Sequence, residues 1–241
     1  MTKEQLSSIL FIDIETAPVV PDFESLSENM KKLWIAKSQW FRMKETENAA
    51  PARVFDEKAG IFSEFSKIIC ISIGSLNALE NEWVLRLKSF TDEPEKTLLN
   101  NFFSIISRYA QRQKKLLFCG HNIKEFDLPF ICRRSIINGI PLPESLQLQN
   151  RKPWDHPHTD TMELWRFGDI KHFTSLALLA EVLGIPSPKQ DMDGSMVGKV
   201  FWEEKNISRI ADYCMQDVIT AARVYLHLTG MNDFHFRVDY A

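Results

Sequence analysis

The sequence predicts an α/β fold in which a central mixed β-sheet is flanked by α-helices. Short apolar runs of strand length alternate along the chain with longer stretches that have helical period. A length of 241 residues with 44% hydrophobic residues suits one α/β unit with a sizeable core. We therefore expect a single domain over residues 1–241.

The expected elements follow from apolar periodicity and from turn residues. The strands are expected at residues 8–14, 67–74, 83–90, 115–119 and 159–162. The helices are expected at residues 93–111, 128–138, 174–183 and 207–228, with a helical insertion of about 22–65 between the first two strands. Asp92 and Glu95 have the spacing of a capping box for the helix at 93–111.

Two carboxylates stand two positions apart in the first strand, within the apolar run of residues 9–16. Successive strand side chains point to opposite faces, so Asp13 and Glu15 share one face. Two like charges at the end of a buried strand repel each other unless a cation neutralises them. The alternative interpretation is a solvated strand end with two surface acids.

A third carboxylate, Asp127, follows the strand that breaks at Gly120 and lies in the first turn of the next helix. A negative charge there is favourable for the helix dipole, and Pro129 is tolerated that early in a helix. Helix capping is therefore one explanation for Asp127, and a place beside Asp13 and Glu15 is the other. Asn122 is either a turn residue or a substrate ligand.

The last expected helix carries Tyr213 and Asp217, which are four positions apart and so lie on one face. A phenol beside a carboxylate can orient a water molecule next to a metal ion. The alternative is an ordinary amphipathic helix in which the tyrosine packs its ring and the aspartate faces water.

These three patterns, in this order, resemble the exonuclease motifs of the DEDD superfamily, and Tyr213 resembles the mark of its DEDDy branch. In the sister branch a histidine stands five positions before the last aspartate, where this chain has Asp212. Residues 66–74 and 120–134 are similar to the proofreading domain of family B DNA polymerases. The whole pattern, from about residue 7 to 228, resembles a stand-alone bacterial exonuclease family related to that domain.

The resemblance implies a ribonuclease H-like fold and metal-dependent 3′-5′ exonuclease activity. Because the motifs extend over nearly all of the 241 residues, we expect no polymerase domains among them. The resemblance also implies two divalent cations, Mg²⁺ or Mn²⁺, with nucleoside monophosphates released from a 3′ end. The implied catalytic residues are Asp13, Glu15, Asp127, Tyr213 and Asp217, of which the four carboxylates bind metal. The residues expected to bind substrate are Thr16, Asn122, Phe126 and, as a hypothesis for the loop at 185–199, Lys189.

The expected partner is nucleic acid with a free 3′ end, with single-stranded DNA favoured over RNA. A net charge of −3 argues against coating of nucleic acid over the whole surface, although a local basic groove is compatible with it. In the insertion, lysines alternate with Trp34 and Trp40, which suits single-stranded nucleic acid. The spacing of Leu33, Trp34, Lys37, Trp40 and Phe41 is that of a helix, however, and it favours an apolar helix face that covers the sheet.

The remaining composition points to a cytoplasmic protein without a membrane span or signal peptide. The four cysteines lack metal-site spacing and are expected to be reduced packing residues, whereas His156 and His158 are expected to face solvent. Two rival functions stay open at this point. One is a phosphatase of the haloacid dehalogenase type, and the other is a nuclease-like module that binds nucleic acid without efficient cleavage.

Overall fold

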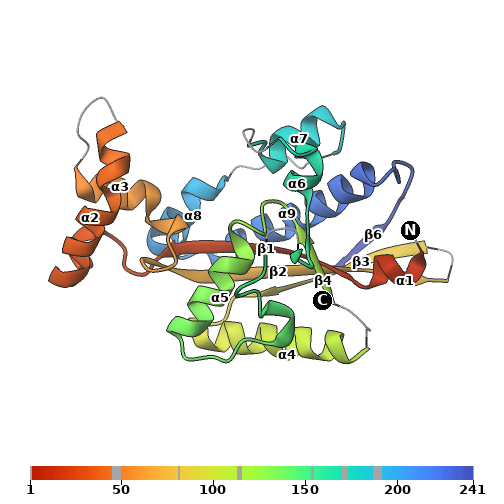
Figure 1. Ribbon diagram of the computed structural model, residues 1–241, viewed down its shortest axis with the longest axis horizontal. Coiled ribbons are helices and arrows are strands. Elements are labelled where there is room, and N and C mark those ends of the chain that lie inside the picture. Colours follow the sequence, from red (N-terminus) through yellow and green to blue (C-terminus); the bar gives the residue numbers. More distant parts are fainter. Residues whose placement is uncertain are drawn as a thin grey trace.

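The fold centres on a mixed sheet of six strands formed by the described residues of a computed structural model (Figure 1). The structure describes residues 2–44, 50–80, 82–112, 116–152, 155–169, 173–186 and 192–240. The strands are β1 (Ile9–Pro18), β2 (Ser66–Leu79), β3 (Glu82–Phe90), β4 (Leu117–Gly120), β5 (Thr159–Asp160) and β6 (Arg237–Tyr240). They lie in the order β5-β4-β1-β2-β3-β6, which confirms the expected α/β class with a mixed sheet.

The central strand β1 pairs antiparallel with β2 on one edge and parallel with β4 on the other. Its run Ile9–Ile12 is buried on both sides, as a central strand requires. The pairing with β4 extends only as far as Phe11 and Cys119, whereas β2 accompanies β1 to Pro18. The last residues of β1 therefore have a partner strand on one edge only.

Helices cover both faces of the sheet (Figure 1). They are α1 (Lys3–Ser7), α2 (Glu28–Lys44), α3 (Pro51–Lys58), α4 (Glu95–Arg112), α5 (Asp127–Ile137), α6 (Thr161–Arg166), α7 (Leu176–Val182), α8 (Val197–Lys199) and α9 (Ile207–Leu228). Short 3-10 segments are η1 (Phe23–Ser25), η2 (Ala59–Ile61), η3 (Glu144–Leu146) and η5 (Gly194–Met196), and η6 (Val200–Glu204) is a π-helix. Helices α4 and α5 pack on one face of the sheet and α9 packs on the other.

The two faces bury separate apolar clusters because side chains alternate along β1. Leu10 and Ile12 belong to the cluster under α4 and α5, and Phe11 belongs to the cluster under α9. The ring of Phe11 packs edge-on against Tyr225 of α9, with 5.8 Å between the ring centroids. The long helix α9 is thereby held against the middle of β1.

The insertion between β1 and β2 folds into α2 and α3, which stand beyond the end of the sheet (Figure 1). Trp34 is completely buried, but in a small cluster of the insertion with Phe55 and Phe65 rather than on the sheet. Leu33 and Trp40 are 59% and 58% exposed. The expectation that one apolar face of this helix covers the sheet is therefore wrong, because the insertion builds its own core. The side chain of Phe41 lies outside the described residues.

The expectations for Glu95 and His158 are wrong, because each side chain forms hydrogen bonds with residues distant in the sequence. Glu95 is the first residue of α4, and its carboxylate accepts hydrogen bonds from the Ile68 amide (2.7 Å) and from Arg134 (Nε 2.9 Å), so it does not complete a capping box with Asp92. His158 is 3% exposed rather than solvent-facing. Its Nδ1 accepts the Phe118 amide hydrogen at 3.2 Å.

The positions of the elements and the state of the cysteines largely match what the sequence predicts. The expected element positions agree within a few residues, and α9 agrees at both ends, whereas α1, α6, α8 and β6 had no expected counterpart. All four cysteines are free, and Cys70, Cys119 and Cys214 are buried, as expected. Among the described residues, no helix combines the length and apolar character needed to span a bilayer.

Candidate active site

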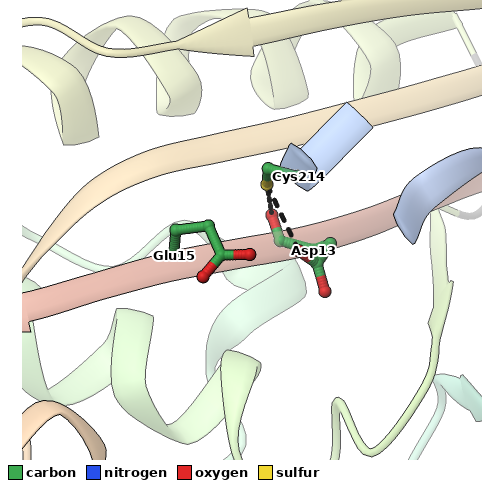
Figure 2. Close-up of side chains that lie close together, drawn as sticks. All are labelled: Asp13, Glu15 and Cys214. Atoms are coloured by element: carbon green, nitrogen blue, oxygen red, sulfur yellow. Dashed lines mark hydrogen bonds between the residues drawn. The ribbon is translucent and has the colours of Figure 1, made fainter. Parts of the chain in front are cut away.

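Strand β1 places Asp13 and Glu15 on the face that α9 covers. In the register with β2, Asp13 lies opposite Ser72 and Glu15 opposite Cys70. Figure 2 shows both carboxylates rising from β1, with Cys214 of α9 against Asp13. Asp13 is half-buried and Glu15 is 7% exposed, so neither is a surface acid in the usual sense. A β-bulge follows directly after Glu15 and ends this regular stretch of β1.

Asp127 reaches the same strand from the first position of α5. Its Oδ1 accepts the backbone N–H of Ile14 at 3.1 Å, and its side chain is buried. This amide lies beyond Phe11, where the pairing of β1 with β4 ends, so the carboxylate replaces a missing strand partner. The N-cap position of α5 is Phe126, which makes no side-chain cap. Asp127 is therefore explained by its contact with β1 rather than by helix capping.

Helix α9 brings Tyr213 and Asp217 to the same place. The Tyr213 phenol interacts with the Asp217 carboxylate and with the charges of Glu15 and Asp13, so these side chains lie close together. Burial, followed by the charge of Asp217, raises the pKa of Tyr213 far above its usual range. The phenol consequently stays protonated at neutral pH and can donate a hydrogen bond.

The electrostatics of the cluster are unfavourable for a set of bare carboxylates. Burial first, and then the charges of neighbouring carboxylates, raise the pKa values of Asp13 and Glu15 well above their usual range. Burial also raises the pKa of Asp127 to about 8, although the hydrogen bond from the Ile14 amide opposes that rise. No described lysine or arginine forms an ion pair with Asp13, Glu15 or Asp127.

The donor set fits divalent cations. Ligand atoms of Asp13, Glu15 and Cys214 all lie within 4.8 Å of one another, and Asp127 and Asp217 add carboxylates to the same cluster. Hard cations such as Mg²⁺ prefer carboxylate oxygens and accept incomplete coordination by the protein. A cation would remove the mutual repulsion that raises the pKa values of these groups.

The expected substrate residues lie around this cluster in different environments. Thr16 follows Glu15 at the bulge, and its hydroxyl donates to the Gly60 carbonyl at 2.7 Å. Phe126 is partly buried and packs against Phe130 at a centroid distance of 5.3 Å. Lys189 lies outside the described residues.

Asn122 occupies the loop between β4 and α5 and has a φ of 64°, a conformation that asparagine tolerates better than most residues. Its backbone N–H donates to Asp160 Oδ1 at 2.9 Å. Its side-chain oxygen is buried and has no hydrogen-bond partner in the described structure. This oxygen is the one unsatisfied polar atom that the structure describes in that loop.

The sequence patterns missed two residues of the site. Asp160, at the end of β5, is buried and accepts the amide hydrogens of Asn122, Lys124 and Met162, so it fixes the loop that precedes α5. Cys214 donates its thiol hydrogen toward Asp13 Oδ2 at 3.2 Å and lies 3.4 Å from the Asp13 carbonyl oxygen. The sequence could have indicated Cys214, because it lies three residues before Asp217 and so on the same face of the helix.

The mixed six-stranded sheet flanked by helices is a ribonuclease H-like fold. The chain belongs to the family described as "Predicted 3′-5′ exonuclease related to the exonuclease domain of PolB", whose model matches residues 61–240. This range includes Asp127, Tyr213 and Asp217 and begins after Asp13 and Glu15, whose strand β1 pairs with β2 inside the matched range. A comparison with curated protein sequences gave no match.

Among solved structures, the chain is similar to the family B DNA polymerase from the hyperthermophilic archaeon Pyrobaculum calidifontis. The TM-score is 0.55 over 91% of this chain, at 13% sequence identity. The chain spans only 24% of the length of that polymerase. The similarity therefore shows a shared fold.

Proposed function

We propose that the protein is a metal-dependent 3′-5′ exonuclease of the DEDDy type. It removes nucleoside monophosphates one at a time from the 3′ end of a nucleic acid, with single-stranded DNA as the favoured substrate. The observation that carries this proposal is the convergence of acidic side chains from three elements, β1, α5 and α9. No described lysine or arginine forms an ion pair with Asp13, Glu15 or Asp127 at this point. Membership of the exonuclease family supports the same chemistry.

Asp13, Glu15, Asp127 and Asp217 are the residues that would hold two Mg²⁺ or Mn²⁺ ions. Such ions, when bound, lower the pKa of a coordinated water and stabilise negative charge on phosphate oxygens. The charges of Glu15, Asp127 and Asp217 all act on Asp13, so Asp13 would be a ligand close to each of the other carboxylates.

The remaining residues of the site position the reacting groups. Tyr213, whose phenol lies beside Asp217, donates or accepts a hydrogen bond and so orients the attacking water. The unsatisfied oxygen of Asn122 is suited to a donor on the terminal nucleotide. Backbone groups at the bulge beside Thr16, together with the Phe126 ring, are the proposed contacts to its sugar and base.

The surface of α2 supports single-stranded nucleic acid as the partner. This helix contains five basic residues and one acidic residue, in a chain whose net charge is −3. Trp40 and Leu33 are largely exposed on it, beside the exposed Lys32 and Lys37. Unpaired bases stack on exposed aromatic rings while lysines meet phosphates. Trp40→Ala should therefore weaken cleavage of a long oligonucleotide and leave a nitrophenyl ester of a nucleoside monophosphate unaffected.

The decisive experiment is degradation of a 5′-labelled single-stranded DNA oligonucleotide with Mg²⁺, with Mn²⁺ and with a chelator. The variants are Asp13→Ala and Asp217→Asn. Asp212→Asn is the matched control, because Asp212 is an exposed carboxylate on the same helix. We expect a ladder that shortens from the 3′ end with metal, persists in the control and is lost in both site variants.

Three other results would redirect the assignment. Binding of the oligonucleotide without metal-dependent cleavage would make the chain a nuclease-like binding module. Retention of most turnover by Asp217→Asn would show that the proposed metal ligands are wrong. Release of inorganic phosphate from a small phosphoester, without shortening of DNA, would point instead to a phosphatase.

A further inference from the structure

Cys214 is part of the acidic cluster. It sits on α9 one residue after Tyr213, and its sulfur faces β1 rather than a neighbouring helix (Figure 2). The Sγ atom lies 3.2 Å from Asp13 Oδ2, and the ligand atoms of Cys214, Asp13 and Glu15 all lie within 4.8 Å of one another. The three side chains thus present one sulfur and two carboxylates to a common point.

The environment of Glu15 gives an independent reason to expect a ligand there. Its side chain is 7% exposed, yet no described residue forms a hydrogen bond or an ion pair with its carboxylate. A buried carboxylate without a partner is costly, and in proteins such groups are normally paired or bind a metal. The unpaired carboxylate points to a cation, and the sulfur beside it determines which class of cation.

We propose that Asp13, Glu15 and Cys214 form a mixed carboxylate–thiolate site for a thiophilic divalent cation, of which Zn²⁺ and Cd²⁺ are the representatives. Soft sulfur ligands select such ions, whereas Mg²⁺ is bound by oxygen. When the metal–sulfur bond forms, the Cys214 thiol proton passes to solvent, and the hydrogen bond to Asp13 is replaced by shared coordination of the ion.

The required movement is small. In a tetrahedral zinc site, metal–ligand distances of about 2.0–2.3 Å place the ligand atoms roughly 3.5 Å apart. The three atoms already lie within 4.8 Å of one another, so side-chain rotations that bring them closer by about 1 Å suffice. A substrate oxygen or a water completes the coordination.

The consequence for the proposed function is inhibition. The thiophilic ion occupies Asp13 and Glu15, the same carboxylates that the catalytic ions need, so the two classes of cation compete. This inhibitory effect rests on the proposed nuclease function, whereas binding of the soft cation does not. Zn²⁺ should accordingly inhibit Mg²⁺-supported cleavage, and Cys214→Ser should relieve that inhibition.

The test uses Co²⁺ as a spectroscopic substitute for Zn²⁺ on the full chain after treatment with chelator. Wild-type protein should develop the near-ultraviolet charge-transfer absorption of a thiolate–cobalt bond, and Cys214→Ser should lose it while folding normally by circular dichroism. Cys132→Ser is the matched control, because the Cys132 thiol donates a hydrogen bond to the Leu146 carbonyl and is not part of the cluster. This substitution should leave the absorption unchanged. Competition with Cd²⁺ should show that Cys214→Ser lowers Cd²⁺ affinity by at least about tenfold, the smallest loss usual for altered metal surroundings.

An unchanged cobalt absorption in Cys214→Ser, or none in the wild type, would overturn this assignment whatever the nuclease assay shows. Should the serine variant fail to fold, cadmium NMR of the wild-type protein decides. A resonance in the range of mixed sulfur–oxygen coordination supports the site, and one in the range of oxygen-only coordination refutes it. A protein that lacks nuclease activity but shows the cobalt–sulfur absorption retains the soft-cation site.

Discussion

Protonation of His158 should destabilise the protein as the pH falls below neutrality. The ring is almost completely buried, its Nδ1 accepts the Phe118 amide hydrogen at 3.2 Å, and its Nε2 lies 3.0 Å from the Ser145 carbonyl oxygen. A second proton on Nδ1 would face an N–H donor. Burial, aided by the charges of His156 and Lys124, lowers the pKa of His158 from 6.5 to about 4.

The sign and size of the effect follow from linkage. Because the folded-state pKa lies below the unfolded value, the stabilisation is complete above pH 6.5 and is lost as the pH falls toward about 4. The difference between the two pKa values corresponds to about 3 kcal/mol in the free energy of unfolding. At about pH 5, one unit above the folded-state pKa, about 2 kcal/mol should already be lost.

Urea unfolding of the wild type and of His158→Gln measures this contribution, since glutamine does not titrate. The raised pKa values of Asp13 and Glu15 act in the opposite direction, because carboxyls that favour the protonated form stabilise the fold as the pH falls. Only the difference between the two proteins isolates His158. The free energy of unfolding of the wild type, relative to that of the variant, should fall by about 2 kcal/mol between about pH 7.5 and about pH 5. A difference independent of pH would refute the buried neutral ring.

Three further predictions concern stability elsewhere in the molecule. Arg134→Ala should cost about 3–5 kcal/mol in urea unfolding, because Glu95 would stay buried without a charged partner, whereas an Arg134→Met/Glu95→Gln double variant keeps an acceptor for the Ile68 amide and should recover part of that loss. Gly120→Ala should cost about 1–3 kcal/mol, since an added Cβ would lie 2.5 Å from the Ile12 carbonyl oxygen; an unchanged melting temperature would contradict this packing. Mg²⁺ at about a hundred times its Kd should stabilise the wild type by about 2.7 kcal/mol. Asp13→Asn should be more stable than the wild type without metal and gain little from Mg²⁺, which calorimetry can check.

The fold was largely predictable from local patterns. The apolar run before Asp13 predicted a central strand, and the helix at 207–228 was predicted at both of its ends. These elements have a strong period over many residues, so local sequence specifies them. The short elements α6 and β6 were not predicted, because four to six residues carry too weak a period to be distinguished from loop.

The candidate site could be predicted in part. Alternation along a strand and the helical repeat determine which side chains lie on the same face of one element. These rules placed Asp13 with Glu15, and Tyr213 with Asp217. They could not say that Asp127 would bind the Ile14 amide, 113 positions away, because that contact exists only where β4 stops pairing with β1. They also assigned the exposed Trp40 and the buried Trp34 to one face.

The sequence by itself determined the α/β class, the order of the long elements and the two pairs of site residues that are neighbours within one element. Only the tertiary structure decided that Cys214 meets Asp13 across 201 positions, that His158 is buried and that Glu95 pairs with Arg134. The reason is physical. Propensity and period act over a few residues, whereas these contacts depend on how separate elements pack and on which buried polar groups need partners.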